Sequence, residues 1–281
     1  MKTSWGKPVH VIPFIRTLLI TLSVTVCLAT LMGCGNSPEK DASPADDIET
    51  LRKAAEQGDS EAQTDLGMRY YTGDGVPKYY AKAAKWYRKA AEQGLADAQY
   101  KLGLMYYDGR GVPEDDAEAV KWYRKAAEQG DASAQRNLGR MYYDGRGVRE
   151  DDPEAVKWYR KAAEQGDAYA QYNLGVMYDN GWGVPEDDAE ALKWCRKAAD
   201  QGYAWAQSML GNKYYYGEGV PKDDVAGYAW FSVAAASGHD DGREYRDEIK
   251  DELTPSQLEK GQAMAREISE RIKKRKAAEA E

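Results

Sequence analysis

The sequence has few of the side chains from which most active sites are built. Its 281 residues include two histidines and three cysteines. A zinc site needs clustered cysteine and histidine, and a catalytic triad needs a histidine beside its nucleophile. His10 lies in a segment that resembles an export signal, and we interpret the remaining His239 as an ordinary surface residue. The composition therefore predicts a protein that is not an enzyme, with no catalytic residue, metal or cofactor.

The strand-like alternation of hydrophobic and polar residues is also missing. A glycine-rich phosphate loop that follows a strand is therefore excluded. The acidic loop "DGRGVPEDDAEA", residues 108–119, does not fit an EF-hand, because Arg110 and Val112 occupy positions of oxygen ligands. Its Asp115 and Asp116 are better explained as helix caps. The pattern indicates an all-α protein.

Acidic residues outnumber basic ones, with a formal net charge of −8. The first 33 residues contain Lys2, Lys7 and Arg16 and no acid, so the 36 basic and 47 acidic groups of residues 34–281 give a net charge of −11. Such a chain repels nucleic acid, whose binding depends on contacts between cations and phosphates. We therefore expect no nucleic-acid partner, and a cationic or apolar protein surface as the natural partner.

The N-terminus has the layout of an export signal, because the three basic residues are followed by the uncharged stretch "TLLITLSVTVCLATLMGC". Its end, "LMGC", resembles a bacterial lipobox, which implies lipidation of Cys34 and cleavage before it. We predict a lipoprotein export signal over residues 1–33 and a periplasmic protein bound to a membrane through this lipid. By resemblance to proteobacterial lipoprotein sorting, Gly35 rather than an aspartate after the cysteine implies the outer membrane. The alternative is an inner-membrane signal anchor, because residues 17–38 are uncharged and long enough to span a bilayer.

Residues 34–46, which include "GNSPEKDASPAD", predict a flexible, lipid-anchored tether. With Cys27 removed and Cys34 acylated, Cys195 has no cysteine partner, so the fold must be held by packing rather than by disulfides.

A 36-residue repeat occupies most of the remaining chain. The string "KAAEQG" begins at Lys53, Lys89, Lys125 and Lys161 and recurs as "KAADQG" at Lys197. A fixed period of this length is typical of a solenoid. Each copy contains two helical patterns, such as 131–145, which ends at a glycine, and 117–130, which begins after Asp116 as its N-cap.

The copies resemble the Sel1-like repeat, a relative of the tetratricopeptide repeat, through "A-x-A-Q-x-x-L-G-x-x-Y-x-x-G-x-G-V" followed by "A-x-x-W-x-x-K-A-A-x-Q-G". The resemblance implies a right-handed α-solenoid of five helix–turn–helix repeats whose first helices line the concave side. We place the solenoid at residues 47–238 and a C-terminal helical cap at 239–281, with helices over 240–253 and 255–276. A terminal cap covers the otherwise open end of such a stack.

Comparison between copies separates two faces of the first helix. Ala62, Gln63, Leu66, Gly67 and Tyr70 mark nearly constant columns that form one packing stripe. The variable columns lie on the opposite face and are rich in Tyr, Trp and Arg, the residues enriched in interface hot spots. The alternative is that some of these side chains pack between repeats. The predicted partner-binding residues are Tyr100, Tyr107, Arg136, Arg140, Tyr143, Tyr169, Tyr172, Trp182 and Trp205.

Trp182 is the most conspicuous departure, because other copies have Asp74, Arg110, Arg146 or Glu218 in its place. We predict that this column has no packing role and that Trp182 anchors a partner.

The resemblance also implies adaptor or scaffold roles. Sel1-like lipoproteins occur as immunity proteins against secreted antibacterial phospholipases of type VI systems. We therefore expect a protein partner on the concave first-helix face, such as a phospholipase effector. A scaffold for envelope or exopolysaccharide assembly is the alternative, and a hydrolase is the remote one.

Lipid anchoring is tested by Cys34→Ala. We expect an unacylated, uncleaved precursor, because the lipid is added to the thiol of Cys34 before cleavage. Metabolic labelling with a fatty-acid probe and the size of the chain on a gel measure both effects. Continued processing and labelling of the variant would show that the lipobox assignment is wrong.

Overall fold

The computed structural model describes residues 44–278, which form thirteen helices and, within that range, no strand. The predicted export signal, Cys34 and most of the expected tether lie outside the described residues. Helix α1 (Pro44–Glu56) includes the last three positions of the expected tether. No helix between residues 44 and 278 is both long and apolar enough to cross a membrane.

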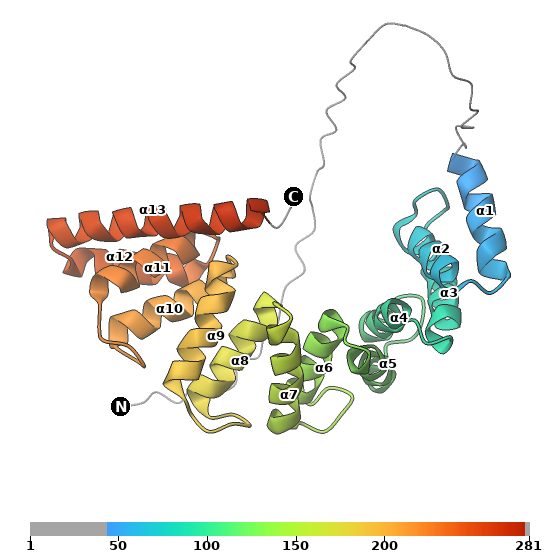
Figure 1. Cartoon of the computed structure of the whole chain (residues 1–281), viewed down its shortest axis with the longest axis horizontal. Helices are drawn as coiled ribbons and strands as arrows, with labels where there is room; N and C mark the ends of the chain where they lie inside the picture. Colours follow the sequence, from blue (N-terminus) through green and yellow to red (C-terminus); the bar gives the residue numbers. More distant parts are fainter. Residues whose placement is uncertain (1–43, 279–281) are drawn as a thin grey trace, which may run out of the picture. The chain divides into compact units, whose positions relative to one another are not determined.

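Five helix pairs follow α1, and each pair packs against the next along the chain (Figure 1). The first helices are α2 (Ser60–Thr72), α4 (Ala96–Asp108), α6 (Ala132–Asp144), α8 (Ala168–Asn180) and α10 (Ala204–Tyr216). The second helices are α3 (Tyr80–Glu92), α5 (Asp116–Glu128), α7 (Asp152–Glu164), α9 (Asp188–Asp200) and α11 (Asp224–Ala236). We number these pairs as repeats one to five. The expected all-α solenoid is confirmed.

Local sequence signals set the bounds of the helices. In repeat three the side chain of Asp131 accepts a hydrogen bond from the backbone N–H of Ala134 at 2.6 Å, and α6 ends at Gly145, whose φ of 66° favours glycine. The second helix of repeat two is capped by Asp115, which accepts from the N–H of Glu118 at 2.9 Å. The prediction of Asp116 as this cap is therefore wrong by one residue.

The invariant glycine of each first helix lies directly beneath a side chain of its second helix. A Cβ atom at Gly103 would be 2.7 Å from Cδ1 of Tyr123, closer than real contacts allow. Gly67 faces Tyr87 in the same way, and Gly139 faces Tyr159. The glycine column therefore permits the close approach of the two helices. The predicted packing stripe is confirmed, because Ala62, Gln63, Leu66, Gly67 and Tyr70 are all buried.

Buried glutamines connect three successive helices of the stack. The Nε2 atom of Gln135 donates to the backbone oxygen of Ala127 at 3.0 Å, and its Oε1 accepts from Nε2 of Gln165 at 2.8 Å. Such pairing is needed because an unsatisfied buried amide is costly. In repeat five Ser237 stands at the position that Gln165 has in repeat three. Oε1 of Gln207, the counterpart of Gln135, therefore has no hydrogen-bond partner.

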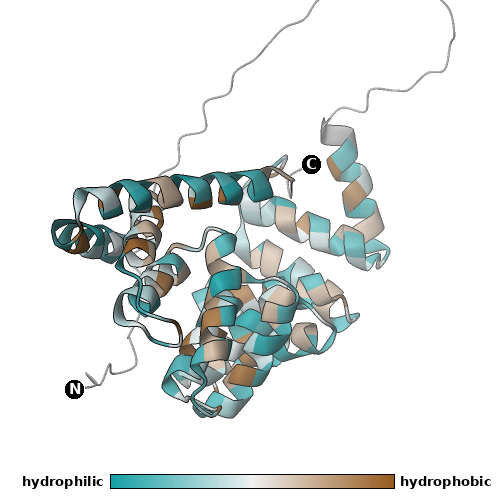
Figure 2. Ribbon diagram, turned by 60° about the vertical axis from the view of Figure 1, so that its left-hand side comes forward, coloured by the Kyte–Doolittle hydropathy of each residue, from teal (hydrophilic) through white to brown (hydrophobic). Residues whose placement is uncertain are grey.

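Two helices follow repeat five and form the expected cap. Helix α12 is Asp240–Glu252, and α13 is Pro255–Ala278. Thr254 caps α13 together with Gln257, since the Thr254 hydroxyl donates to Oε1 of Gln257 at 2.7 Å and its own oxygen accepts from the Gln257 N–H at 3.3 Å. Helix α13 packs against α11, and it is the strongly hydrophilic outer layer at this end of the stack (Figure 2).

His239 is not a surface residue, contrary to the prediction, because only 7% of it is exposed. Its Nδ1 accepts a hydrogen bond from the N–H of Gly242 at 3.0 Å and so caps α12. The indole ring of Trp205 meets the imidazole edge to face, with ring centroids 4.4 Å apart. His239 therefore joins repeat five to the cap.

The cap should make stability depend on pH. Burial lowers the pKa of His239 below its ordinary value of 6.5, and the negative charges of Asp241 and Asp240 oppose this effect. The unfolded chain therefore binds more protons just below that pH. The contribution of neutral His239 to the free energy of unfolding is fully present above about pH 6.5. It is lost as the pH falls toward the pKa of His239 in the folded protein. Urea denaturation across this range should show the loss in the wild type. His239→Asn, which retains a good N-cap, should not show it, and an equal slope in both proteins would contradict the assignment.

Candidate partner-binding site

In repeats two and three, two adjacent tyrosines near the end of the first helix contact the repeats on either side. The first of them faces backward. Tyr142 in repeat three accepts a hydrogen bond from Nη2 of Arg124 in α5 at 2.6 Å, and Tyr178 accepts one from Arg160 in α7 at 2.7 Å. These bonds link the second helix of one repeat to the first helix of the next.

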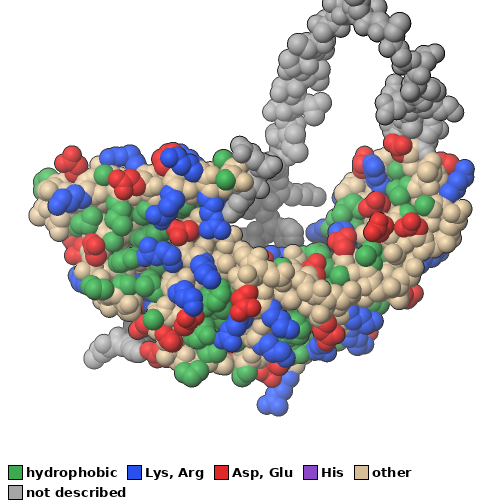
Figure 3. Space-filling view, viewed as in Figure 1, with side chains coloured by type: hydrophobic (Ala, Val, Ile, Leu, Met, Phe, Trp, Pro, Cys, Tyr) green, Lys and Arg blue, Asp and Glu red, His purple; other side chains and the backbone are tan. Residues whose placement is uncertain are grey.

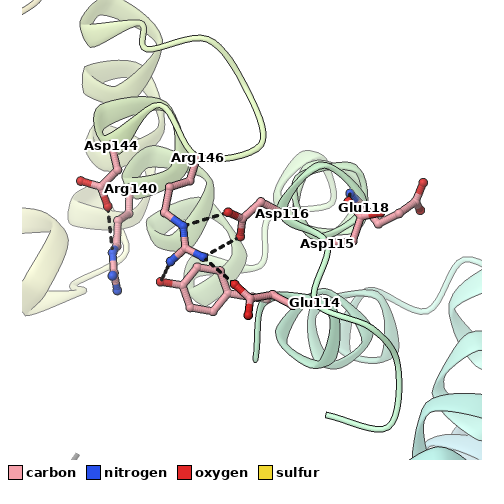
Figure 4. Close-up of polar contacts among 8 residues, drawn as sticks. Glu114, Asp115, Asp116, Glu118, Arg140, Asp144 and Arg146 are labelled. Carbon is pink, nitrogen blue, oxygen red and sulfur yellow. Dashed lines mark hydrogen bonds and ion pairs between the residues drawn. The ribbon is translucent and has the colours of Figure 1, made fainter. Parts of the chain in front are cut away.

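The second tyrosine faces forward, toward the loop of the following repeat. Nη1 of Arg146 donates to the hydroxyl of Tyr107 at 2.7 Å, while its Nε and Nη2 hold both carboxylate oxygens of Asp116 at 2.9 and 2.8 Å (Figure 4). Gly147 allows this loop to dock, since a Cβ there would lie 2.3 Å from the Asp116 carbonyl oxygen. We call Tyr107, Asp116 and Arg146 the inter-repeat clamp.

Trp182 occupies the position of the clamp arginine in repeat four. Its ring lies 5.9 Å from that of Tyr143, the counterpart of Tyr107. Both side chains are half-buried and pack against the core of repeats three and four. The prediction that this column has no packing role is therefore wrong, because an aromatic pair replaces the arginine–tyrosine contact.

At the junction between repeats four and five, a buried lysine takes the place of the clamp arginine. Asp179 replaces the forward-facing tyrosine, and Lys213, with a side chain only 1% exposed, forms ion pairs with Asp179 and Asp188. Asp188 is the counterpart of Asp116, so Lys213 reaches the same two positions as Arg146. The sequence signal was available, since Lys213 interrupts a column of Met105, Met141 and Met177.

The two predicted arginines of the first-helix face are already paired with acids. Arg136 forms an ion pair with Asp167 at 2.7 Å, and Arg140 forms one with Asp144 at 3.3 Å (Figure 4). The Arg140 guanidinium also lies 5.7 Å from the ring centroid of Tyr107. Their charges are therefore largely balanced within the chain.

Predicted aromatic residues gather in repeats three to five. Tyr169 and Tyr172 flank the ring of Tyr203 at 6.3 and 5.4 Å, and burial raises the pKa of Tyr169 and Tyr172, so both stay neutral hydrogen-bonding groups. Tyr100 lies apart from them, in repeat two, 6.0 Å from Tyr123. Tyr203 was missed from the sequence, although it stands where three earlier copies have Asp59, Asp131 and Asp167.

Trp205 is the most accessible of the predicted aromatic residues, with 43% of its surface exposed. Tyr169 shares its column, but their ring partners differ: Trp205 meets His239, and Tyr169 meets Tyr203. Figure 3 shows how hydrophobic side chains alternate with charged ones over one face of the molecule. We define the aromatic surface as Tyr143, Tyr169, Tyr172, Trp182, Tyr203 and Trp205.

The described residues offer little for a metal or for nucleophilic chemistry. Between residues 44 and 278 no group of three or more His, Cys, Asp and Glu side chains is arranged to hold a metal ion. Cys195 is fully buried, and burial raises the pKa of its thiol to about 12. A thiol in that state is a packing group and not a nucleophile.

Comparison with known families matches the Sel1 repeat to residues 51–59, 60–95, 96–131, 132–167, 168–203 and 206–239. A Sel1 repeat protein from Oxalobacter formigenes is 34% identical, with a TM-score of 0.66, over 80% of this chain and 97% of that one. A protective antigen of uropathogenic Escherichia coli with an SLR fold is 40% identical, with a TM-score of 0.73, over 80% of this chain. The chain spans about half, 49%, of that antigen.

More distant similarity extends to an immunity protein from Pseudomonas aeruginosa, at 24% identity and a TM-score of 0.42, over 72% of this chain and 78% of that one. A likeness at that level carries no inference about function. A comparison with functionally curated proteins gave no match.

The packing role of Trp182 is tested by two substitutions. Trp182→Ala removes the ring contact with Tyr143 and should lower the free energy of unfolding by about 1 kcal/mol. Trp182→Arg should lose less, because an arginine there can donate to Tyr143 as Arg146 does to Tyr107. Urea denaturation measures both, with Arg149→Ala in an exposed loop position as the control. If Trp182→Ala were as stable as the wild type, the Trp182 ring would not stabilise the junction between the repeats.

Proposed function

The chain belongs to the Sel1 repeat family, a protein-binding solenoid, and we propose that it is a lipid-anchored periplasmic immunity protein. Its partner in this proposal is a secreted antibacterial phospholipase effector of a type VI system, held on the first-helix face and thereby neutralised. The proposal rests on the family, on the predicted lipoprotein signal and on the aromatic surface of repeats three to five.

The single observation that carries the proposed binding mode is the exposure of Trp205 within the aromatic surface. A tryptophan that is 43% exposed on a rigid helix presents a large contact area at little cost in conformational entropy. Within the same aromatic surface, the rings of Tyr169, Tyr172 and Tyr203 are held by one another. Because such rings are already ordered in the free protein, little entropy is lost when a partner covers them.

Charge and location support the same partner. The net charge of −11 over residues 34–281 favours a cationic protein surface and speeds its association. Lipidation of Cys34 would hold the solenoid at the inner side of the outer membrane, where a phospholipase must be blocked before it reaches the lipid. A solenoid that covers the mouth of the enzyme needs no chemistry of its own.

The proposal is tested with a periplasm-targeted phospholipase effector encoded beside this chain. We expect the wild type to form a complex, abolish phospholipase activity and protect cells. The double variant Trp182→Arg/Trp205→Ala should bind tens to hundreds of times more weakly, because loss of one central aromatic anchor costs about 2–4 kcal/mol. Calorimetry of the complex and phospholipid hydrolysis measure both effects.

The control is Lys121→Ala/Lys157→Ala on the second helices, where both lysines are exposed and pair with glutamates of their own helix. This control should bind as the wild type does. Circular dichroism must show that both double variants remain folded. Binding without inhibition would favour a scaffold in envelope or exopolysaccharide assembly, and a variant that binds as tightly as the wild type would rule out the aromatic surface.

A further inference from the structure

A cleft with a basic lining lies between α11, α12 and α13, in the C-terminal part of the molecule. Its volume is about 370 Å³, and its lining consists of Tyr228, Ser232, Arg246, Asp247, Lys250, Gln262, Ala265 and Arg266. Three of these side chains are cationic and one is acidic. This excess of positive charge contrasts with the net charge of −8 of the whole chain.

The cations of the cleft are poorly neutralised by the protein. Arg246 is paired with Asp247, from its Nη2 at 2.7 Å and its Nε at 2.8 Å. Lys250 and Arg266 form no ion pair or hydrogen bond with any residue between 44 and 278. They come from different helices, Lys250 from α12 and Arg266 from α13, so the fold brings two like charges to one cleft. An anion between them relieves their repulsion.

Tyr228 adds a polar group to the lining of the cleft. Its hydroxyl forms no hydrogen bond with any residue between 44 and 278, and it is open to solvent. Its ring is fixed by the crossing of α11 and α13, because a Cβ at Gly261 would lie 2.7 Å from Cδ1 of Tyr228. The Ser232 hydroxyl, by contrast, is already bonded to the Tyr228 carbonyl at 2.8 Å.

We propose that this cleft binds a small anion that carries a phosphate group. A net excess of two positive charges matches a phosphate dianion better than a single carboxylate. The available donors are the guanidinium of Arg266, the ammonium of Lys250 and the hydroxyl of Tyr228. Donors from three helices suit the several acceptor oxygens of a tetrahedral group. The volume suits a compact ligand rather than a polymer.

Two sources supply such a group, a soluble phosphate ester and the headgroup of an anionic phospholipid. The shared chemistry is the phosphate, so the experiment needs both probes. This inference is independent of the aromatic surface, since none of the cleft residues belongs to it.

The test uses the full chain in detergent, titrated with inorganic phosphate and with glycerol 3-phosphate and followed by calorimetry. A parallel flotation assay uses phosphatidylcholine vesicles with and without phosphatidylglycerol. We expect saturable binding of at least one probe, weakened about tenfold or more in Lys250→Gln/Arg266→Gln. Both positions are exposed, so circular dichroism should remain unchanged.

The matched control is Lys260→Gln/Lys274→Gln, which removes two exposed charges of α13 outside the cleft. It should bind each probe within about twofold of the wild type. Binding of a soluble phosphate identifies that source, and binding confined to phosphatidylglycerol vesicles identifies the lipid headgroup. Absence of binding to both probes, or an equal loss in the two double variants, would overturn the proposal.

Discussion

The close approach of the two helices within each repeat depends on one glycine, over which a side chain of the second helix lies. At Gly103 and Gly139 this side chain is a tyrosine, and no Cβ fits beneath either ring. The contact fixes the distance and the rotation of the pair. Between repeats, the buried Gln135 donates to the backbone oxygen of Ala127 on the preceding helix. Each later contact between repeats assumes this spacing.

The junctions between repeats then follow one rule with three chemical solutions. A position at the end of a first helix and another at the start of a second helix are joined by a side chain of the next repeat. Arg146 performs this role with a tyrosine and an aspartate, Trp182 with a tyrosine ring, and Lys213 with two carboxylates. A residue that varies between the copies therefore does not always mark exposed surface. Some of these residues vary together with the residue that they contact in the neighbouring repeat.

This distinction narrows the surface available to a partner. Arg136 and Arg140 form ion pairs with Asp167 and Asp144. The aromatic rings are therefore the dominant feature of the first-helix face in repeats three to five. Unneutralised cations are instead found in the C-terminal cleft, at Lys250 and Arg266. The molecule thus offers two chemically different surfaces, one aromatic and one basic, on separate elements of the same stack.

The sequence by itself determined the repeat, the helix bounds to within two residues and the packing stripe that contains Leu66, because these depend on contacts near in sequence and on a period that copies itself. It also located the aromatic residues of the variable columns. Only the tertiary structure decided what those residues touch. Trp182 meets Tyr143 of the neighbouring repeat, and Trp205 of repeat five meets the buried His239 at the start of the cap. Comparison within a column cannot detect such pairs, since each partner belongs to a different column of an adjacent repeat.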